Sequence, residues 1–210
     1  MDTKETILAA ADQVFGEVGY DAATTREIAE SCGVNKALIH YHFKNKEGLL
    51  AAVLDRYYDR LGAEVAGALG GAATLRDKLV RLVDAYADFL GQNLRFCRIV
   101  QREASGGMHA DKIRDRMVPI FELGRAALVA EYPASATGDL AAEHLLISVY
   151  GLIVTWFTYG DVIAPLLGSA PAAKRQLTAR KRHVRRIVTL LLDALERPAA
   201  PTRSAGEIGG

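Results

Sequence analysis

The sequence predicts an all-α protein with an N-terminal three-helix helix-turn-helix head and a C-terminal helical bundle that dimerises. Residues 24–50 contain two short helical segments joined at Gly33, followed at once by a third helix start. Farther along the chain, apolar residues recur at helical spacing and few runs alternate as strands do. The stretch 145–160 is apolar on every face and carries no full charge, so it needs cover on more than one side.

The first helix supports the head. Asp2 and Glu5 can cap its start, and Gly19 can end it. Its apolar face at helical spacing consists of Ile7, Leu8, Ala11, Val14, Phe15 and Val18. We expect this helix to pack against its neighbours and to carry little chemistry of its own.

Capping signals define the next two helices. Thr24 and Glu27 fit a capping box, and Gly33 can take the positive φ of a sharp turn. Asn35 then caps a third helix, whose apolar side consists of Leu38, Ile39 and Phe43. A fourth helix starts at Asn45, with Lys46 in its first turn, where a helix N-terminus and a lysine both favour a phosphate.

The remaining side chains of the third helix suit DNA better than a core, since they can contact phosphates and base edges. They are Lys36, Ala37, His40, Tyr41 and His42. The chain carries a net charge of +1, and residues 1–50 hold five Lys or Arg against eight Asp or Glu. Positive charge is concentrated between Lys36 and Lys46, so local distribution sets the phosphate footprint.

This arrangement resembles the TetR/AcrR family of one-component transcriptional regulators over roughly residues 3–55. In that family the third helix enters the major groove, and the fourth links the head to a ligand-binding, dimerising bundle. The resemblance implies phosphate contacts by Thr25, Tyr41, His42 and Lys46. It implies base contacts by Arg26, Lys36, Ala37 and His40. Members commonly carry Tyr where this chain has His40.

Each of these residues also has a structural interpretation. Thr25 could reinforce a helix cap, and Arg26 and Lys36 could be solvated charges. His40 and His42 could be packed, hydrogen-bonded imidazoles, and they point to different faces of the helix. Tyr41 could belong to the core.

The rest of the chain reads as a helical body with a tail. Predicted helices cover 49–66, 74–92, 94–105, 110–132, 139–160 and 172–196, separated at Gly70-Gly71, Gly106-Gly107, 133–138 and 165–171. We expect a DNA-binding domain over 1–46, a ligand-binding and dimerisation domain over 47–197, and a disordered tail over 198–210.

The apolar 139–160 helix predicts a homodimer. It is too short to span a bilayer, so no membrane partner is expected. A second subunit is the simplest cover, giving a four-helix interface of 139–160 and 172–196. The alternative is a central helix of a monomeric bundle. The basic run 174–186 is interpreted as a solvated face or as pairing between subunits.

A ligand pocket in the body follows chiefly from the resemblance. Its candidate residues are Tyr57, Tyr86, Phe89, Phe96, Met117, Phe121, Tyr150, Val154 and Phe157, with Arg102, Glu103, His109 and His144 as polar orienters. Core packing explains most of the apolar members as well. The aromatic, apolar set favours a hydrophobic or amphipathic effector.

The predicted function is a ligand-responsive transcriptional regulator that binds a pseudo-palindromic double-stranded DNA operator as a homodimer. The resemblance implies a repressor that a small-molecule effector releases. The alternative is a helical small-molecule-binding dimer, or an enzyme, without sequence-specific DNA binding.

A glycine-rich phosphate loop, metal-ligand spacing and a nucleophile elbow are absent from the sequence, so we expect neither catalysis nor a cofactor or metal. A charged first helix and two distant cysteines predict a cytoplasmic protein with reduced thiols.

Overall fold

The structure is a computed structural model that describes residues 2–105 and 109–196. Within those ranges it contains ten α-helices, one 3-10 helix and no strand, so the all-α prediction is confirmed. The predicted tail 198–210 and the break at Gly106-Gly107 lie outside the described residues.

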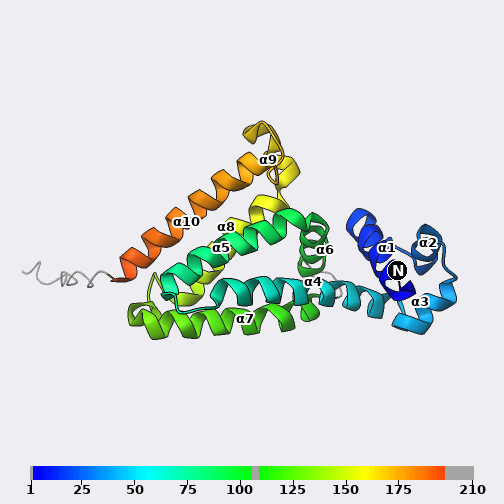
Figure 1. The fold of residues 1–210 in the computed structure, drawn as a ribbon, viewed down its shortest axis with the longest axis horizontal. Helices are drawn as coiled ribbons and strands as arrows, with labels where there is room; N and C mark the ends of the chain where they lie inside the picture. The colour runs from blue at the N-terminus through cyan, green and yellow to red at the C-terminus, as the bar shows by residue number, and fades with distance from the viewer. Residues whose placement is uncertain (1, 106–108, 197–210) are drawn as a thin grey trace, which may run out of the picture.

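The helices form an elongated molecule with the head at one end (Figure 1). The head consists of α1 (Thr3–Val18), α2 (Thr25–Ser31), α3 (Lys36–Phe43) and the start of α4 (Lys46–Leu69). The body contains α5 (Leu75–Gln92), α6 (Leu94–Ala104), α7 (Ala110–Glu131), η1 (Pro133–Ala136), α8 (Ala142–Thr158), α9 (Gly160–Leu167) and α10 (Lys174–Glu196). Helix α4 runs from the head along the body and so belongs to both parts (Figure 1).

Side-chain caps fix the helix starts of the head. Thr24 and Glu27 form the predicted capping box at the start of α2. The Asn35 carboxamide accepts from the Ala37 backbone N–H, and the Asn45 carboxamide accepts from that of Gly48. These caps satisfy backbone donors that a helix leaves unpaired, which is why the chain turns at these residues.

The core of the head forms where the apolar faces of its helices meet. Its fully buried side chains include Ile7, Phe15, Ile28, Ile39 and Leu49. Two predicted members of the apolar faces lie on the surface instead, because Val18 is 54% exposed and Leu38 is 37% exposed. Both stand at the edge of their helix's packed face, where spacing alone does not decide burial.

The body departs from the predicted helix boundaries at the end of α8. The expected helix 139–160 ends at Thr158, and α9 begins at Gly160 after a bend of 82°. The break predicted at 165–171 therefore starts inside α9. In the described ranges no single helix has the length and apolar character to cross a membrane, and the bent pair α8 and α9 meets that test only when the two are taken together.

Candidate functional site

Helix α3 presents a polar face outward while its other face is fixed in the core. Ile39 is 1% exposed and Phe43 is 6% exposed, so both anchor the helix. Tyr41 is 80% exposed, which makes the core interpretation of this residue wrong. Lys36, Ala37 and His40 are exposed as well. The helix can therefore lay this face against another molecule without unfolding the head.

His42 occupies an intermediate position on α3. It is half-buried, and its ring meets the Tyr41 ring edge-on at a centroid distance of 5.0 Å. The centroid of the Phe43 ring lies 6.0 Å from that of the His42 ring. These contacts restrict the orientation of the Tyr41 ring on the exposed face.

The start of α2 contributes Thr25 and Arg26. The capping role belongs to Thr24, whose hydroxyl accepts from the Glu27 backbone N–H, so Thr25 is not the capping residue. Hydrogen bonds from Thr24 lower the pKa of Glu27. Arg26 is exposed but pairs with Glu30 at 2.7 Å, so a phosphate or base would have to compete with this carboxylate.

Lys46 does not point outward as expected. Its Nζ donates to the backbone carbonyls of Tyr20 at 2.9 Å, Asp21 at 3.4 Å and Ala23 at 3.0 Å. The ammonium also lies 4.2 Å from the centroid of the Tyr20 ring. It therefore holds the turn between α1 and α2, and a phosphate contact at this place has only the α4 N-terminus to support it.

Two predicted pocket residues belong to the junction between head and body. The Tyr57 hydroxyl donates to the Asp12 carboxylate at 2.6 Å, and Arg95 approaches the same carboxylate at 3.5 Å. Arg102 Nη1 donates to the Phe15 carbonyl at 3.5 Å. Tyr57 and Arg102 thus connect the body to α1 and are not among the residues that line the apolar cavity described below, contrary to the expected placement.

The expected polar orienters are also elsewhere. Glu103 and His109 are buried near Tyr20, whose ring meets that of His109 edge-on at 4.6 Å. Glu103 Oε2 and His109 Nε2 have no hydrogen-bond partner among the described residues. Burial raises the pKa of Glu103. His144 is exposed on α8 and is not among the residues that line the apolar cavity described below, so it is not a core imidazole, and its role toward a ligand stays a prediction.

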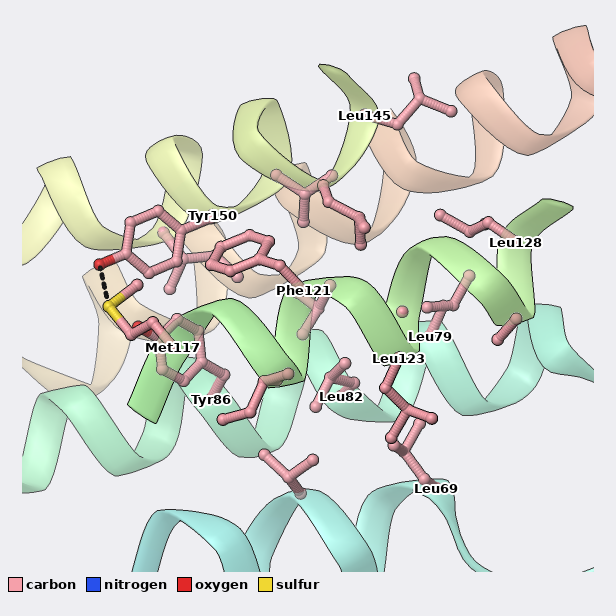
Figure 2. Close-up of a pocket in the computed structure, with 18 of the residues that line it drawn as sticks. Leu69, Leu79, Leu82, Tyr86, Met117, Phe121, Leu123, Leu128, Leu145 and Tyr150 are labelled. Carbon is pink, nitrogen blue, oxygen red and sulfur yellow. Dashed lines mark hydrogen bonds between the residues drawn. The ribbon is translucent and has the colours of Figure 1, made fainter. Parts of the chain in front are cut away.

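An apolar cavity of about 350 Å³ lies between α4, α5, α6, α7, α8 and α10 (Figure 2). Five predicted residues line it: Tyr86, Phe96, Met117, Phe121 and Tyr150. Phe89, Val154 and Phe157 do not, because they pack elsewhere in the body core. Among the described residues, the lining contains no charged side chain. Whether the lining residues contact a ligand stays a prediction.

Sequence reasoning missed Tyr58 and the aliphatic part of the lining. The missed residues include Tyr58, Leu61, Val65, Leu69, Leu75, Leu79, Leu82, Val83, Leu123, Leu128, Leu145, Leu146, Val149, Ile153, Val188 and Leu192. Leu75, Leu79 and Leu82 recur on one face of α5 at helical spacing, which was the available signal. Core and cavity wall look alike in sequence, because both are apolar stripes.

The polar groups of the cavity gather at one end. Tyr86, Met117 and Tyr150 lie together there, away from Leu69 and Leu128 (Figure 2). Tyr150 Oη donates to Met117 Sδ at 3.8 Å, and its ring stacks on that of Tyr86 at 6.2 Å. An occupant of this cavity would therefore meet hydroxyls only at this end.

Helix α10 uses its basic run inside the subunit, which neither sequence interpretation anticipated. Lys181 pairs with Asp88 at 2.6 Å, and Arg185 pairs with Asp84 at 3.1 Å. The Arg180 guanidinium lies 4.8 Å from the centroid of the Trp156 ring. These contacts attach α10 to α5 and α8.

Several apolar side chains of α8, α9 and α10 stay uncovered. Ile147 of α8 is 61% exposed and Leu190 of α10 is 48% exposed. On α9, Val162 is 76% exposed and Leu166 is 87% exposed. Across the described ranges, no group of three or more His, Cys, Asp or Glu side chains could hold a metal ion.

The fold and the exposed α3 face together define a helix-turn-helix protein with a helical, cavity-bearing body. Residues 7–53 match the family model described as bacterial regulatory proteins, tetR family. Over these residues, which form the head and the start of α4, the chain matches the TetR family.

Individual relatives resemble different parts of the chain. The HTH-type transcriptional activator FasR of Mycolicibacterium smegmatis is 37% identical over 94 residues, which are 45% of this chain and 43% of FasR. The class A tetracycline repressor protein from transposon 1721 of Escherichia coli is 25% identical over 191 residues, 91% of this chain and 80% of the repressor. The chain spans about half or less of the length of several curated relatives that it matches.

The whole fold is found in solved structures. The fatty acid degradation regulator FadR from Bacillus halodurans superposes with a TM-score of 0.71 at 23% identity, over 94% of this chain and 99% of that chain. At this identity the likeness concerns the fold alone.

Proposed function

We propose that the protein is a ligand-responsive transcriptional regulator that reads duplex DNA with α3. The observation that carries the proposal is the 80% exposure of Tyr41 on a short helix anchored by buried Ile39 and Phe43. A tyrosine, a lysine and an imidazole on one exposed face can donate to phosphates and base edges. The proposed DNA contacts are Thr25, Arg26, Lys36, Ala37, His40, Tyr41 and His42.

A homodimer is the proposed functional unit. A head with eight acidic and five basic residues gains little binding free energy from its net charge, so two heads are needed to bind DNA with useful affinity. The uncovered apolar residues of α8 and α10, Ile147 and Leu190, support an interface through these two helices. Two α3 helices would then enter successive major grooves of a pseudo-palindromic operator, about one helical turn apart.

The proposed effector is hydrophobic or amphipathic and occupies the cavity. A lining without charged residues disfavours sugars and free phosphates, since burying an uncompensated charge is costly. Because the proposed target is chromosomal DNA, the proposed site of action is the cytoplasm.

The proposal is tested by electrophoretic shift of duplex DNA from the region upstream of the gene that encodes the chain. We expect a salt-sensitive complex that unlabelled random duplex does not compete away. Tyr41→Ala and Lys36→Ala should weaken it, by about 1–3 kcal/mol for a base contact, while leaving folding intact. Unchanged affinity in both folded variants would contradict the role of α3.

Regulation by repression, with release by effector, is the form that we propose. Relatives include both an activator and a repressor, so the sign needs its own measurement. A reporter gene placed behind the bound DNA should be silenced by the chain and restored by the effector. A ligand-binding dimer without DNA recognition is the competing function, and it predicts no specific shift at any salt concentration.

A further inference from the structure

A second, polar hollow lies next to the tyrosine end of the cavity, between α4 and α7. It measures about 200 Å³ and is lined by Ala51, Leu54, Asp55, Tyr58, Lys112, Asp115 and Arg116. Tyr58 lines both spaces. Its hydroxyl is buried and has no hydrogen-bond partner within the described part of the chain. A hydroxyl left without a partner at such a border is suited to a ligand that crosses it.

Two ion pairs join the walls of this polar hollow. Lys112 Nζ on α7 lies 2.7 Å from Glu47 Oε1 on α4. One turn farther along α7, Arg116 pairs with Asp55 of α4. Both pairs therefore tie the start of α7 to the part of α4 that leaves the head.

These ion pairs are open to competition. Their four side chains are between 32% and 53% exposed, so water screens the attraction and each pair contributes little to stability. Lysine and arginine also bind carboxylates and phosphates strongly, and a guanidinium does so with two parallel hydrogen bonds. A better-placed anion can thus replace the carboxylates of Glu47 and Asp55.

The two spaces have complementary chemistry. The cavity offers apolar contact and tyrosine hydroxyls but no charge, so it can hold a hydrocarbon chain and cannot stabilise a charged head group. Immediately beyond Tyr58 the polar hollow offers the cations of Lys112 and Arg116, and its lining also contains the carboxylates of Asp55 and Asp115. A molecule that satisfies both is an amphiphile with an anionic head.

Resting on the proposed function, we propose that the polar hollow binds the carboxylate or phosphate head of an amphiphile whose apolar chain fills the cavity. The head group takes Lys112 and Arg116 away from Glu47 and Asp55. Ligand binding then removes both cross-links between α7 and α4. The ligand therefore binds more tightly to the state in which α4 is no longer held to α7 by these ion pairs. Such a difference in affinity between two states is what a ligand-driven switch requires.

Isothermal titration of the full-length protein tests the site with three probes of equal chain length: dodecanoate, dodecyl phosphate and dodecanol. Each is used below its critical micelle concentration. We expect at least one of the two anions to bind at least tenfold more tightly than the neutral alcohol, and the stronger anion identifies the head group. In the double variant Lys112→Gln/Arg116→Gln this preference should disappear while dodecanol binding persists.

Substitution of the acidic partners, Glu47 and Asp55, should change anion affinity in the opposite direction. Glu47→Gln and Asp55→Asn remove the competing carboxylates, so each should tighten binding of the preferred anion by roughly two- to fivefold. Dodecanol affinity should stay the same. Arg125→Gln and Glu64→Gln are the matched controls, because both side chains are exposed on the same two helices and neither lines the polar hollow.

The outcomes separate this site from the cavity itself. If dodecanol binds to the wild-type protein as tightly as both anions, the head-group site is overturned, but the cavity is still supported as a binding site for the apolar chain. An unchanged anion preference in the folded double variant would lead to the same conclusion. Failure of all three probes to bind would overturn the cavity as an effector site, and this proposal with it. The comparison of probes on the wild-type protein does not depend on the folding of any variant.

Discussion

The Tyr57 hydroxyl donates a 2.6 Å hydrogen bond to the carboxylate of Asp12, and this contact connects α4 with α1 across the junction of head and body. Both residues are buried, and Arg95 is the second group near the same carboxylate. The head is therefore oriented by a charge-assisted hydrogen bond in a dry place, where such bonds are strong.

Tyr57→Phe should destabilise the protein by about 1–3 kcal/mol, because the buried carboxylate of Asp12 loses its closest donor. Chemical denaturation measures the change in the free energy of unfolding. The double variant Asp12→Asn/Tyr57→Phe should recover part of the loss, since it no longer buries a charge. A Tyr57→Phe protein as stable as wild type would show that this contact does not orient the head.

Lys46 and Lys36 should respond differently to the loss of charge. Lys46→Met removes three hydrogen bonds to backbone carbonyls and should lower the free energy of unfolding by about 1–3 kcal/mol, with the salt slope of DNA binding unchanged. Lys36→Met should leave stability within about 0.5 kcal/mol and reduce the salt slope by about 1. Fluorescence anisotropy over a salt series, together with thermal unfolding, measures both quantities. The reverse pattern would assign the phosphate contact to Lys46.

Gly48 permits the tight turn between α3 and α4. A Cβ at this residue would lie 2.2 Å from the Phe43 carbonyl oxygen, which does not move independently of the backbone. Gly48→Ala should therefore destabilise the head by about 1–3 kcal/mol and weaken DNA binding. Gly67→Ala is the matched control on α4, where a Cβ would meet nothing within 4 Å. It should stabilise the helix by up to about 1 kcal/mol, and equal effects of the two changes would contradict the account.

Glu103 should make stability depend on pH. Burial raises its pKa above the ordinary value of 4.5, so the folded protein holds a proton that the unfolded chain releases. The ionised carboxylate is penalised in the folded state, and its contribution to stability therefore falls as the pH rises from 4.5 through the raised value. Glu103→Gln should raise the free energy of unfolding at pH 7, and this advantage should vanish below pH 4.5. The exposed Glu64→Gln serves as control, and a pH-independent effect of Glu103→Gln would exclude the burial argument.

Local signals predicted the head well. Caps at Thr24, Asn35 and Asn45 and the turn at Gly33 act over a few residues, and each lies where the sequence indicated. The inward direction of Lys46 depends on carbonyls more than twenty residues away, which no local pattern shows.

The body was predicted less completely. The expected helix ended at residue 160, close to the observed end of α8 at Thr158, but neither α9 nor the 82° bend before it was predicted. Tyr86 and Tyr150 lie together at the cavity, whereas Tyr57, Phe89 and Phe157 do not, and only the packing of six helices distinguishes them. Spacing identifies an apolar face but not whether that face meets a neighbour or an empty volume.

Selection of binding sites from random duplex DNA tests the central claim most directly. If α3 reads DNA as one half of a dimer, the full-length protein should enrich an inverted repeat whose half-sites lie about one helical turn, or a multiple of it, apart. The double variant Tyr41→Ala/Lys36→Ala, if it is as stable as the wild-type protein, should enrich no common sequence. Enrichment of the same repeat by this double variant, or of no sequence by the wild-type protein, would contradict the reading of DNA through α3.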